Sequence, residues 1–456
     1  MHTPGGTCMS EEEKKNELLE ICEAGDRERL QTYFSEHEPI DIAQETEEWD
    51  SEDLQKLTSL MEEDDLAYLM EQAEDKQRIR LARTLDNKRL LVAFGYMQKD
   101  DIVDMLSDFP IGRRKDVLNL MKAGDRKIIT DLLNYPDDSA GGIMTTQYIA
   151  LREDLTLSDA LKKIREIGAR SEVIETIYVT NSAGQLTGSA DLRDLLSEPE
   201  DHLLRDIEDT HVITVRPEED QEEAAHLVSK YDLKSIPVVS NTNRILGIIT
   251  VDDIIDVIQE EANEDMLQMA GVSGEESLDT SLAESIRLRL PWLLVNLATA
   301  FLASFTVKAF ESTIAQVVAL SATMTIVTGM GGNAGSQTMS ILVRDLANGD
   351  ISWDKAKKPL FKEILLGLVD GAACGLVTGI IVWLVYGNAW LGVIIFIAMI
   401  GNLVVSGTFG FLVPVVLKKL HADPAISSSI FVTTATDVLG FFIFLGLAKA
   451  FLSKLI

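Results

Sequence analysis

The stretch SSIFVTTATDVLGFFIFLGLAKAF, residues 428–451, is apolar enough to cross a membrane and carries one acidic side chain, Asp437, near its middle. A carboxylate at that depth costs at least about 2.5–3.5 kcal/mol of insertion free energy. Acids inside membrane spans are rare, and they face water, a partner or an ion. The stretch therefore predicts a membrane helix in which Asp437 has a specific role.

Four further apolar runs precede this one, and together they predict five spans near residues 290–308, 313–342, 361–386, 390–417 and 426–453. Each run is long enough to cross about 30 Å of hydrocarbon. Arginines and lysines gather before the first run, between the second and third, and between the fourth and fifth. By the positive-inside rule these segments are cytoplasmic. We therefore predict a plasma-membrane (inner-membrane) protein with a cytoplasmic N-terminus and its C-terminus outside.

The second run contains GMGGNAGSQ, residues 329–337, whose glycines are expected to weaken the helix and let backbones approach closely. Small residues alone indicate tight packing at least as readily as a pore. Together with Asp437 they favour a polar pathway. Asp370 in the third run is a second intramembrane acid, which either lines such a pathway or makes a buried hydrogen bond.

Acidic residues are concentrated in the part of the chain that precedes the spans. Residues 1–284 hold 65 of the 73 acids and 29 of the 41 bases, a net charge of −36, whereas residues 285–456 carry +4. So acidic a region repels phosphate groups, which argues against nucleic acid as a partner. The same region attracts cations.

Two segments in the middle of the chain repeat. IYVTNSAGQLTGSADLRDLL (177–196) aligns with IPVVSNTNRILGIITVDDII (236–255) at a constant offset of 59 residues. Each copy reads as strand, polar turn, strand and helix, so one supersecondary unit is used twice. The pattern resembles a pair of cystathionine-β-synthase (CBS) domains, an α/β regulatory module. That resemblance implies that Thr250 and Asp253 hold the ribose of an adenine nucleotide such as ATP.

The region before the repeat is expected to be helical. Apolar residues recur at spacings of three and four through residues 10–135, which predicts a superhelical stack of short helices. The chain is thus expected to be a multidomain membrane protein. Its predicted parts are a helical N-terminal domain (1–138), two α/β CBS domains (139–202 and 203–262), a linking or plug helix (263–289) and an all-α, five-helix membrane domain (290–456).

From end to end this order resembles the MgtE-type magnesium transporters. The resemblance rests on YPDDSAGGIMT (135–145), TVDDIIDVI (250–258), GGNAGSQ (331–337), DPA (423–425) and TTATD (433–437). It implies a homodimeric, Mg²⁺-selective channel whose cytosolic domains bind Mg²⁺ and close the pathway when internal Mg²⁺ is high. The alternatives are a transporter of broader specificity, for Co²⁺ or Mn²⁺, and a membrane-anchored CBS sensor without transport. The sequence shows no nucleophile–base arrangement, so no enzyme is expected.

Mg²⁺ prefers oxygen ligands and sheds water reluctantly, so a pathway site needs few protein charges. One Asp437 from each subunit of a dimer would supply two carboxylates around a largely hydrated ion, and Asn333 would face the same pathway. The competing interpretation is a buried Asp437 bonded to a hydroxyl such as that of Thr433. Asp423 is expected to cap the fifth span, with Pro424 as its first helical residue. The resemblance adds a role for Asp423 as a Mg²⁺ ligand between the mouth of the pathway and the linking helix.

The remaining candidate Mg²⁺ ligands lie in the cytosolic domains. A helix leaving the second CBS domain carries Asp253, Asp256, Glu261, Glu264 and Asp265, which repel one another unless cations or solvent screen them. The resemblance adds Asp220, Glu222 and Asp232 in the second CBS domain and Asp100 and Asp104 in the helical domain. A ligand expected before Asp100 has no clear equivalent, because DDLAYLM (64–70) aligns ambiguously.

Overall fold

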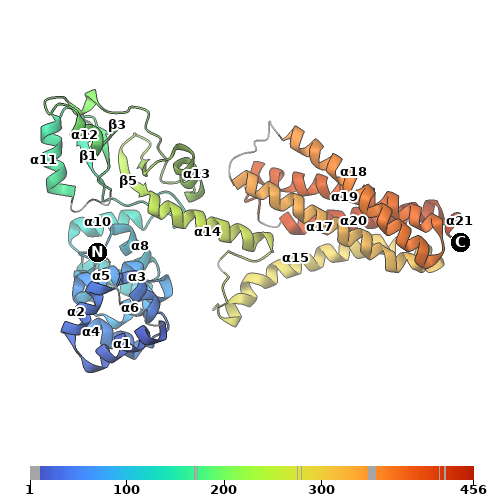
Figure 1. Ribbon diagram of the computed structural model, residues 1–456, viewed down its shortest axis with the longest axis horizontal. Helices are drawn as coiled ribbons and strands as arrows, with labels where there is room; N and C mark the ends of the chain where they lie inside the picture. The colour runs from blue at the N-terminus through green and yellow to red at the C-terminus, as the bar shows by residue number, and fades with distance from the viewer. Residues whose placement is uncertain are drawn as a thin grey trace, which may run out of the picture. The chain divides into compact units, whose positions relative to one another are not determined.

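The computed structural model describes residues 11–168, 171, 173–274, 276–278, 280–347, 356–420, 422–425 and 428–456. The chain divides into two compact units, Met1–Asp256 and Val257–Ile456, and most of their elements are labelled in Figure 1. The division falls inside a single helix, α14 (Val251–Met269). It therefore precedes residue 262, where the sequence predicted the end of the second CBS domain.

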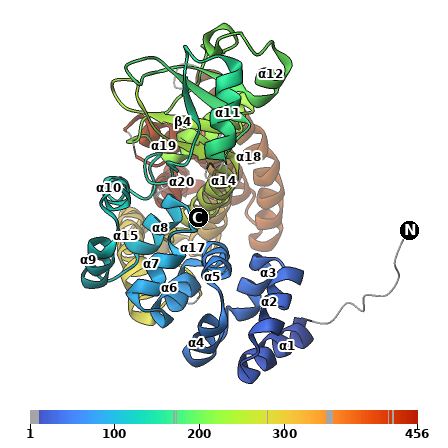
Figure 2. The same ribbon diagram turned by 90° about the vertical axis from the view of Figure 1, so that its left-hand side faces the viewer.

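The first unit begins with ten short helices. They are α1 (Glu11–Ala24), α2 (Arg27–Glu36), α3 (Pro39–Thr46), α4 (Ser51–Leu60), α5 (Glu63–Gln72), α6 (Asp75–Thr84), α7 (Asn87–Ala93), α8 (Lys99–Ser107), α9 (Ile111–Leu120) and α10 (Ala123–Leu132). Helices α3, α5, α7 and α9 pack one on the next, and α4, α6, α8 and α10 do the same (Figure 2). Asp26, Asp50 and Asp86 start three of them by accepting backbone N–H groups of the first turn. The predicted helical stack is confirmed.

The α/β part of this unit holds two small sheets. The first contains β1 (Ala150–Arg152), β2 (Thr176–Thr180) and β3 (Leu186–Asp191), with β1 parallel and β3 antiparallel to β2. The second pairs β4 (Ser235–Val239) with β5 (Ile245–Thr250) in antiparallel fashion. The helices are α11 (Leu157–Ile167), α12 (Leu192–Ser197) and α13 (Gln221–Tyr231), with a short 3₁₀ turn at Leu204–Asp206, and α14 follows β5 directly.

The sequence repeat is reproduced in the strand register. Val179 pairs with Gly188 in the first copy, and Val238 pairs with Gly247 in the second. In both copies the pairing shifts by a bulge directly after the valine. Each copy therefore has the same local geometry at the same offset, and the predicted repeat is confirmed.

The two copies are interlocked by the segments that lead into them. Thr145, ahead of the first copy, bridges to Ile248 in the sheet of the second, and Asp209, ahead of the second, bridges to Ser189 in the sheet of the first. A Cβ at Gly247 would lie only 2.6 Å from the carbonyl oxygen of Thr145, so this crossing requires glycine. The pair therefore folds as one body.

The second unit is helical. After α14 it contains α15 (Leu282–Lys308), α16 (Glu311–Gln316), α17 (Ala319–Ala347), α18 (Lys357–Tyr386), α19 (Ala389–Lys419), α20 (Ser428–Ala450) and α21 (Leu452–Leu455). Helix α19 packs against α17, α18 and α20, and α15 packs against α20. The main core is built on α19, with Ile395, Ala398 and Met399 fully buried.

In the described part of the chain, four helices are long and apolar enough to cross a membrane, namely α15, α18, α19 and Ser429–Ala450 of α20. Helix α17, in the second predicted span, has 29 residues but carries glycine, asparagine and glutamine among its apolar side chains. The single linking helix predicted over 263–289 is wrong. Helix α14 ends at Met269 and α15 begins only at Leu282, and the described residues between them form no helix.

The glycine-rich stretch 329–337 lies inside one continuous helix, α17, so the expected weakening of that helix is not found. Its glycines instead admit neighbours. A Cβ at Gly335 would lie 2.5 Å from the side chain of Val432 on α20, and Gly331 lies against Asn402 of α19. Packing compensates for the low helix propensity of glycine here.

Helices α18 and α19 meet along a seam of glycines spaced four residues apart. These are Gly367, Gly371, Gly375 and Gly379, and all four are buried. A Cβ at Gly371 would lie 2.6 Å from the Cα of Ile400, a backbone atom that cannot swing away. Close backbone approach of this kind is a usual way for helices to associate in membranes.

Gly371→Ala is therefore expected to destabilise the folded protein by about 1–3 kcal/mol through overpacking. Gly446→Ala in α20 is the matched control, because nothing lies within 4 Å of its added Cβ. Thermal unfolding of the purified protein in detergent measures both. Equal melting temperatures for the two variants would contradict the seam.

Candidate cation sites

Asp437 lies in the middle of α20 and is half-buried within the membrane unit. Among the described residues its carboxylate forms no hydrogen bond or ion pair. Thr433, one turn earlier, donates its hydroxyl to the carbonyl oxygen of Ser429 at 2.7 Å instead. The competing interpretation, a bond between Asp437 and Thr433, is therefore not formed, and the carboxylate can receive an ion.

A polar face runs along the neighbouring helix α17. Thr325, Gly329, Asn333 and Gln337 follow one another at a spacing of four and are all exposed in the protomer. Residues at this spacing share one side of a helix. Exposed amides in lipid would lack hydrogen-bond partners, so this face must meet water, protein or a hydrated ion. Helix α17 packs against α20, so Asn333 and Asp437 come from adjacent helices.

Asp423 does not cap the fifth span, and that prediction was wrong. Helix α20 begins at Ser428, well beyond Pro424. The carboxylate of Asp423 accepts the backbone N–H of Ala425 at 2.7 Å instead. Aspartate often closes a turn on its own backbone two residues ahead, and here this local bond forms before the helix starts.

Four of the predicted ligands, three on α14 and one in the segment before α20, interact through their charges. The pKa of Asp265 is raised to about 6, first by burial and then by the negative charges of Asp423, Glu261 and Glu264, while Lys418 opposes the shift. Met269, at the end of the same helix, packs against a buried cluster that includes Ala425 and residues of α17 and α20. The resemblance implied that Asp423 meets the linking helix, but the sequence could not show that Asp265 is the acid it influences.

The three acids predicted in the second CBS domain do not lie together. Asp220 is the N-cap of α13 and accepts the N–H of Glu222 at 2.9 Å. Asp232 ends the same helix in the left-handed conformation, at a φ of 53°. The ends of an 11-residue helix are about 16 Å apart. One ion cannot bind both ends within a protomer.

Thr250 and Asp253 already form a pair. Thr250 is fully buried, and its hydroxyl donates to the Asp253 carboxylate at 2.6 Å. Burial is the main reason why the pKa of Asp253 is raised. A ribose held here would have to share or replace this hydrogen bond. Asp256, on the same helix, is exposed.

The structure adds an acid that the sequence analysis missed. Asp101 in α8 has a pKa raised to about 6, chiefly by burial; Arg78 lowers it and the charge of Asp253 raises it. The pKa of Glu71 is raised to about 7 by burial and by Asp101. Adjacent residues point about 100° apart on a helix. The stretch KDD (99–101) alone therefore does not show which of its two aspartates faces the CBS pair. Asp100 is half-buried and Asp104 is exposed.

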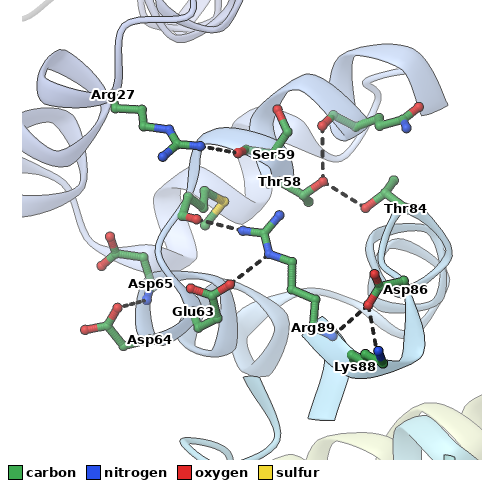
Figure 3. A network of polar contacts seen from close by, with 12 residues as sticks. Arg27, Thr58, Ser59, Glu63, Asp64, Asp65, Thr84, Asp86, Lys88 and Arg89 are labelled. Carbon is green, nitrogen blue, oxygen red and sulfur yellow. Dashed lines mark hydrogen bonds and ion pairs between the residues drawn. The ribbon is translucent and has the colours of Figure 1, made fainter. Parts of the chain in front are cut away.

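The ambiguous stretch DDLAYLM belongs to α5, whose first turn lies in a mixed-charge network (Figure 3). Arg89 donates to the carboxylate of Glu63 at 2.9 Å and to the carbonyl oxygen of Met61 at 2.7 Å. An open cavity of about 720 Å³ here is lined by acids and also by Arg27 and Arg89. Because the arginines neutralise part of the acidic charge, this cavity does not single out the ligand expected before Asp100.

Within the described residues of one protomer, no three histidine, cysteine or acidic side chains lie close enough to hold a metal by themselves. Ions that keep most of their water and bind one or two carboxylates suit such sparse sites. An apolar helical unit whose central carboxylate has no partner among the described residues, joined to a CBS pair and an acidic helical stack, fits the class of membrane cation transporters.

Known proteins share this organisation. Residues 324–447 match the MgtE divalent cation transporter family, residues 37–138 the MgtE intracellular N domain, and residues 140–201 and 204–260 the CBS domain. The magnesium transporter MgtE of Bacillus subtilis is 32% identical over 427 residues, covering 93% of this chain and 94% of that protein. The magnesium transporter MgtE of Thermus thermophilus is 30% identical over 452 residues, covering 97% and 99%.

The chain belongs to the MgtE family of magnesium transporters, whose members are membrane-embedded transporters and not enzymes. A solved structure of the cytosolic domain of the Mg²⁺ channel MgtE in complex with ATP is similar, with a TM-score of 0.51 and 30% identity. It covers 53% of this chain and 99% of that chain. The predicted fold class, with a helical N-terminal domain, paired CBS domains and a helical membrane unit, is confirmed.

Proposed function

We propose that this chain is a Mg²⁺-selective channel that carries Mg²⁺ into the cell across the plasma membrane. The observation that supports it best is the intramembrane carboxylate of Asp437, which has no partner among the described residues and stands on a helix adjacent to the polar face of α17. An ion pathway accounts for both features, because each would otherwise lie unsolvated in lipid. The proposed orientation has a cytoplasmic N-terminus and the C-terminus outside.

The working unit of the proposal is a homodimer. Asn333 and Gln337 are exposed in a single protomer, and a second copy of the same face would enclose a polar pathway between the two chains. Two Asp437 carboxylates would then flank one ion. A pair of carboxylates with retained water is a usual arrangement for Mg²⁺.

The acids of the cytosolic domains are proposed to close this channel when internal Mg²⁺ is high. In the membrane unit, Asp265 already lies in the field of Asp423, Glu261 and Glu264, and a bound cation would relieve their mutual repulsion. An ion pair of 2.7 Å between Glu276 and Arg289 ties the segment after α14 to α15. Movement of α14 can thus reach the first membrane helix.

Adenine nucleotide is the second proposed cytosolic ligand. The cytosolic domain of a related Mg²⁺ channel has been solved with ATP bound, and the corresponding region of this chain contains Thr250 and Asp253. Because the two side chains are paired in the protomer, ATP and Mg²⁺ would compete with that hydrogen bond for Asp253.

Flux into proteoliposomes tests the transport proposal. Purified protein is expected to admit Mg²⁺ faster than Co²⁺ or Mn²⁺, and Mg²⁺ on the cytosolic side is expected to slow the flux. Equal rates for the three ions would instead indicate a transporter of broader specificity. No flux of any ion from folded protein would leave a membrane-anchored CBS sensor.

A further inference from the structure

Asn402 of α19 is a fully buried amide at the junction of three membrane helices. Its Nδ2 donates to the carbonyl oxygen of Val327 on α17 at 2.7 Å. Two glycines make room for it: a Cβ at Gly440 of α20 would lie 2.6 Å from Asn402 Oδ1, and a Cβ at Gly331 of α17 would overlap Nδ2. The amide is therefore held between α17 and α20.

This amide is costly to keep. Oδ1 is buried and has no hydrogen-bond partner among the described residues. Turning the amide over would set Oδ1 against the carbonyl oxygen of Val327, so the hydrogen bond defines its orientation. Met399 and Leu403, close to Asn402 in the sequence, belong to the apolar core. An apolar side chain at position 402 would avoid the cost of burying an amide without full hydrogen bonding. Packing alone therefore does not account for asparagine at this position.

The position of the amide relates it to the proposed pathway. Val327 precedes Asn333 by six residues, about 9 Å along α17, and Gly440 follows Asp437 by three residues, about 4.5 Å along α20. We propose that Asn402 is a positioning residue for Mg²⁺ transport, which holds the Asn333 face of α17 and the Asp437 turn of α20 at the spacing that a hydrated Mg²⁺ requires. This proposal rests on the pathway assigned under the proposed function.

The test replaces Asn402 with leucine, which has similar size but makes no hydrogen bond. The readouts are the half-saturating Mg²⁺ concentration and the ratio of Co²⁺ to Mg²⁺ flux in proteoliposomes, per folded protein. We expect both to change by about fivefold or more, at the lower end of what losing a buried hydrogen bond produces. Ser406→Ala is the control, because among the described residues the buried Ser406 hydroxyl donates to the Asn402 carbonyl oxygen of its own helix and bonds no other helix. It should leave both quantities unchanged.

A second set of variants covers the case in which Asn402→Leu does not fold. Gly440→Ala brings a methyl group against the amide and should shift the same two quantities. Asn402→Ser shortens the side chain that the new methyl group would meet. The double variant Asn402→Ser/Gly440→Ala should therefore transport Mg²⁺ no worse than Asn402→Ser alone. Independent, additive effects would overturn the proposal.

The two proposals fail in different ways. Normal flux through Asp437→Asn would remove the assigned pathway whatever Asn402 does. An inactive Asp437→Asn variant, together with an Asn402→Leu variant whose half-saturation and ion ratio match the wild type, would leave the pathway standing. That result would overturn only the positioning role of Asn402.

Discussion

Replacing Asp437 by asparagine is expected to reduce Mg²⁺ flux to about a tenth of the wild-type rate or less, with the protein still folded. The substitution keeps the shape of the side chain and removes its charge. A hydrated divalent ion entering the apolar unit would then lose its principal protein counter-charge, because no described neighbour of Asp437 supplies another. Flux into proteoliposomes and growth of cells lacking other Mg²⁺ uptake both report the loss.

Asp370→Asn is the matched control, since it removes the other acid that lies deep in a membrane helix. Asp370 is exposed on α18, which packs mainly on α19 and only weakly on α17. We expect this variant to retain most of its flux. If it were inactive while Asp437→Asn conducted normally, the ion site would belong to α18 instead.

The parts of the fold that follow from local rules could be predicted from the sequence. The repeat at an offset of 59 residues predicted two equal units, and the structure gives each the same valine–glycine pair and the same bulge. Strand, turn and strand are set by neighbouring residues, so this pattern can be predicted from the sequence. The interlocking of the copies cannot be predicted in this way, because Thr145 bridges to Ile248 far along the chain.

The errors have a common physical cause. The prediction that Asp423 caps the fifth span followed local rules for aspartate and proline, but a turn closed on Ala425 satisfies the same carboxylate earlier. Helix propensity argued for a weakened helix at 329–337, yet contacts with α19 and α20 keep α17 continuous. In both places a contact that the sequence does not reveal decided between two acceptable local structures.

The candidate site was predictable by residue type more than by grouping. The apolar surroundings of Asp437 make it a candidate without a structure, because a carboxylate in such a run carries a large insertion cost. The cytosolic acids are so numerous that their partners depend on the fold. Asp101 lies in the field of Asp253, which no residue pattern indicates. The resemblance placed Asp423 beside the linking helix but did not single out Asp265.

Neutralising two acids of α14, with Glu261→Gln and Asp265→Asn, is expected to leave a channel that conducts but closes only at higher Mg²⁺. These side chains share a negative field with Asp423, so an ion bound among them would join the end of α14 to the membrane helices. Without the charges of Glu261 and Asp265, this ion is expected not to bind. Coupling between allosteric sites is typically worth about 5–150-fold in affinity. The closing concentration should therefore rise by at least about fivefold.

Flux at a series of cytosolic Mg²⁺ concentrations measures the change, and Mg²⁺-dependent protection of residues 270–281 from protease gives a second reading. The control removes two negative charges from the same unit at exposed positions, with Glu284→Gln and Glu311→Gln. Its closing concentration should match the wild type, because neither residue lies among the α14 acids. Closure of the α14 variant at the wild-type concentration, with undiminished protection, would show that Glu261 and Asp265 form only a solvated surface. The Mg²⁺ sensor would then have to involve the acids of the first unit, such as Asp101 and Asp253.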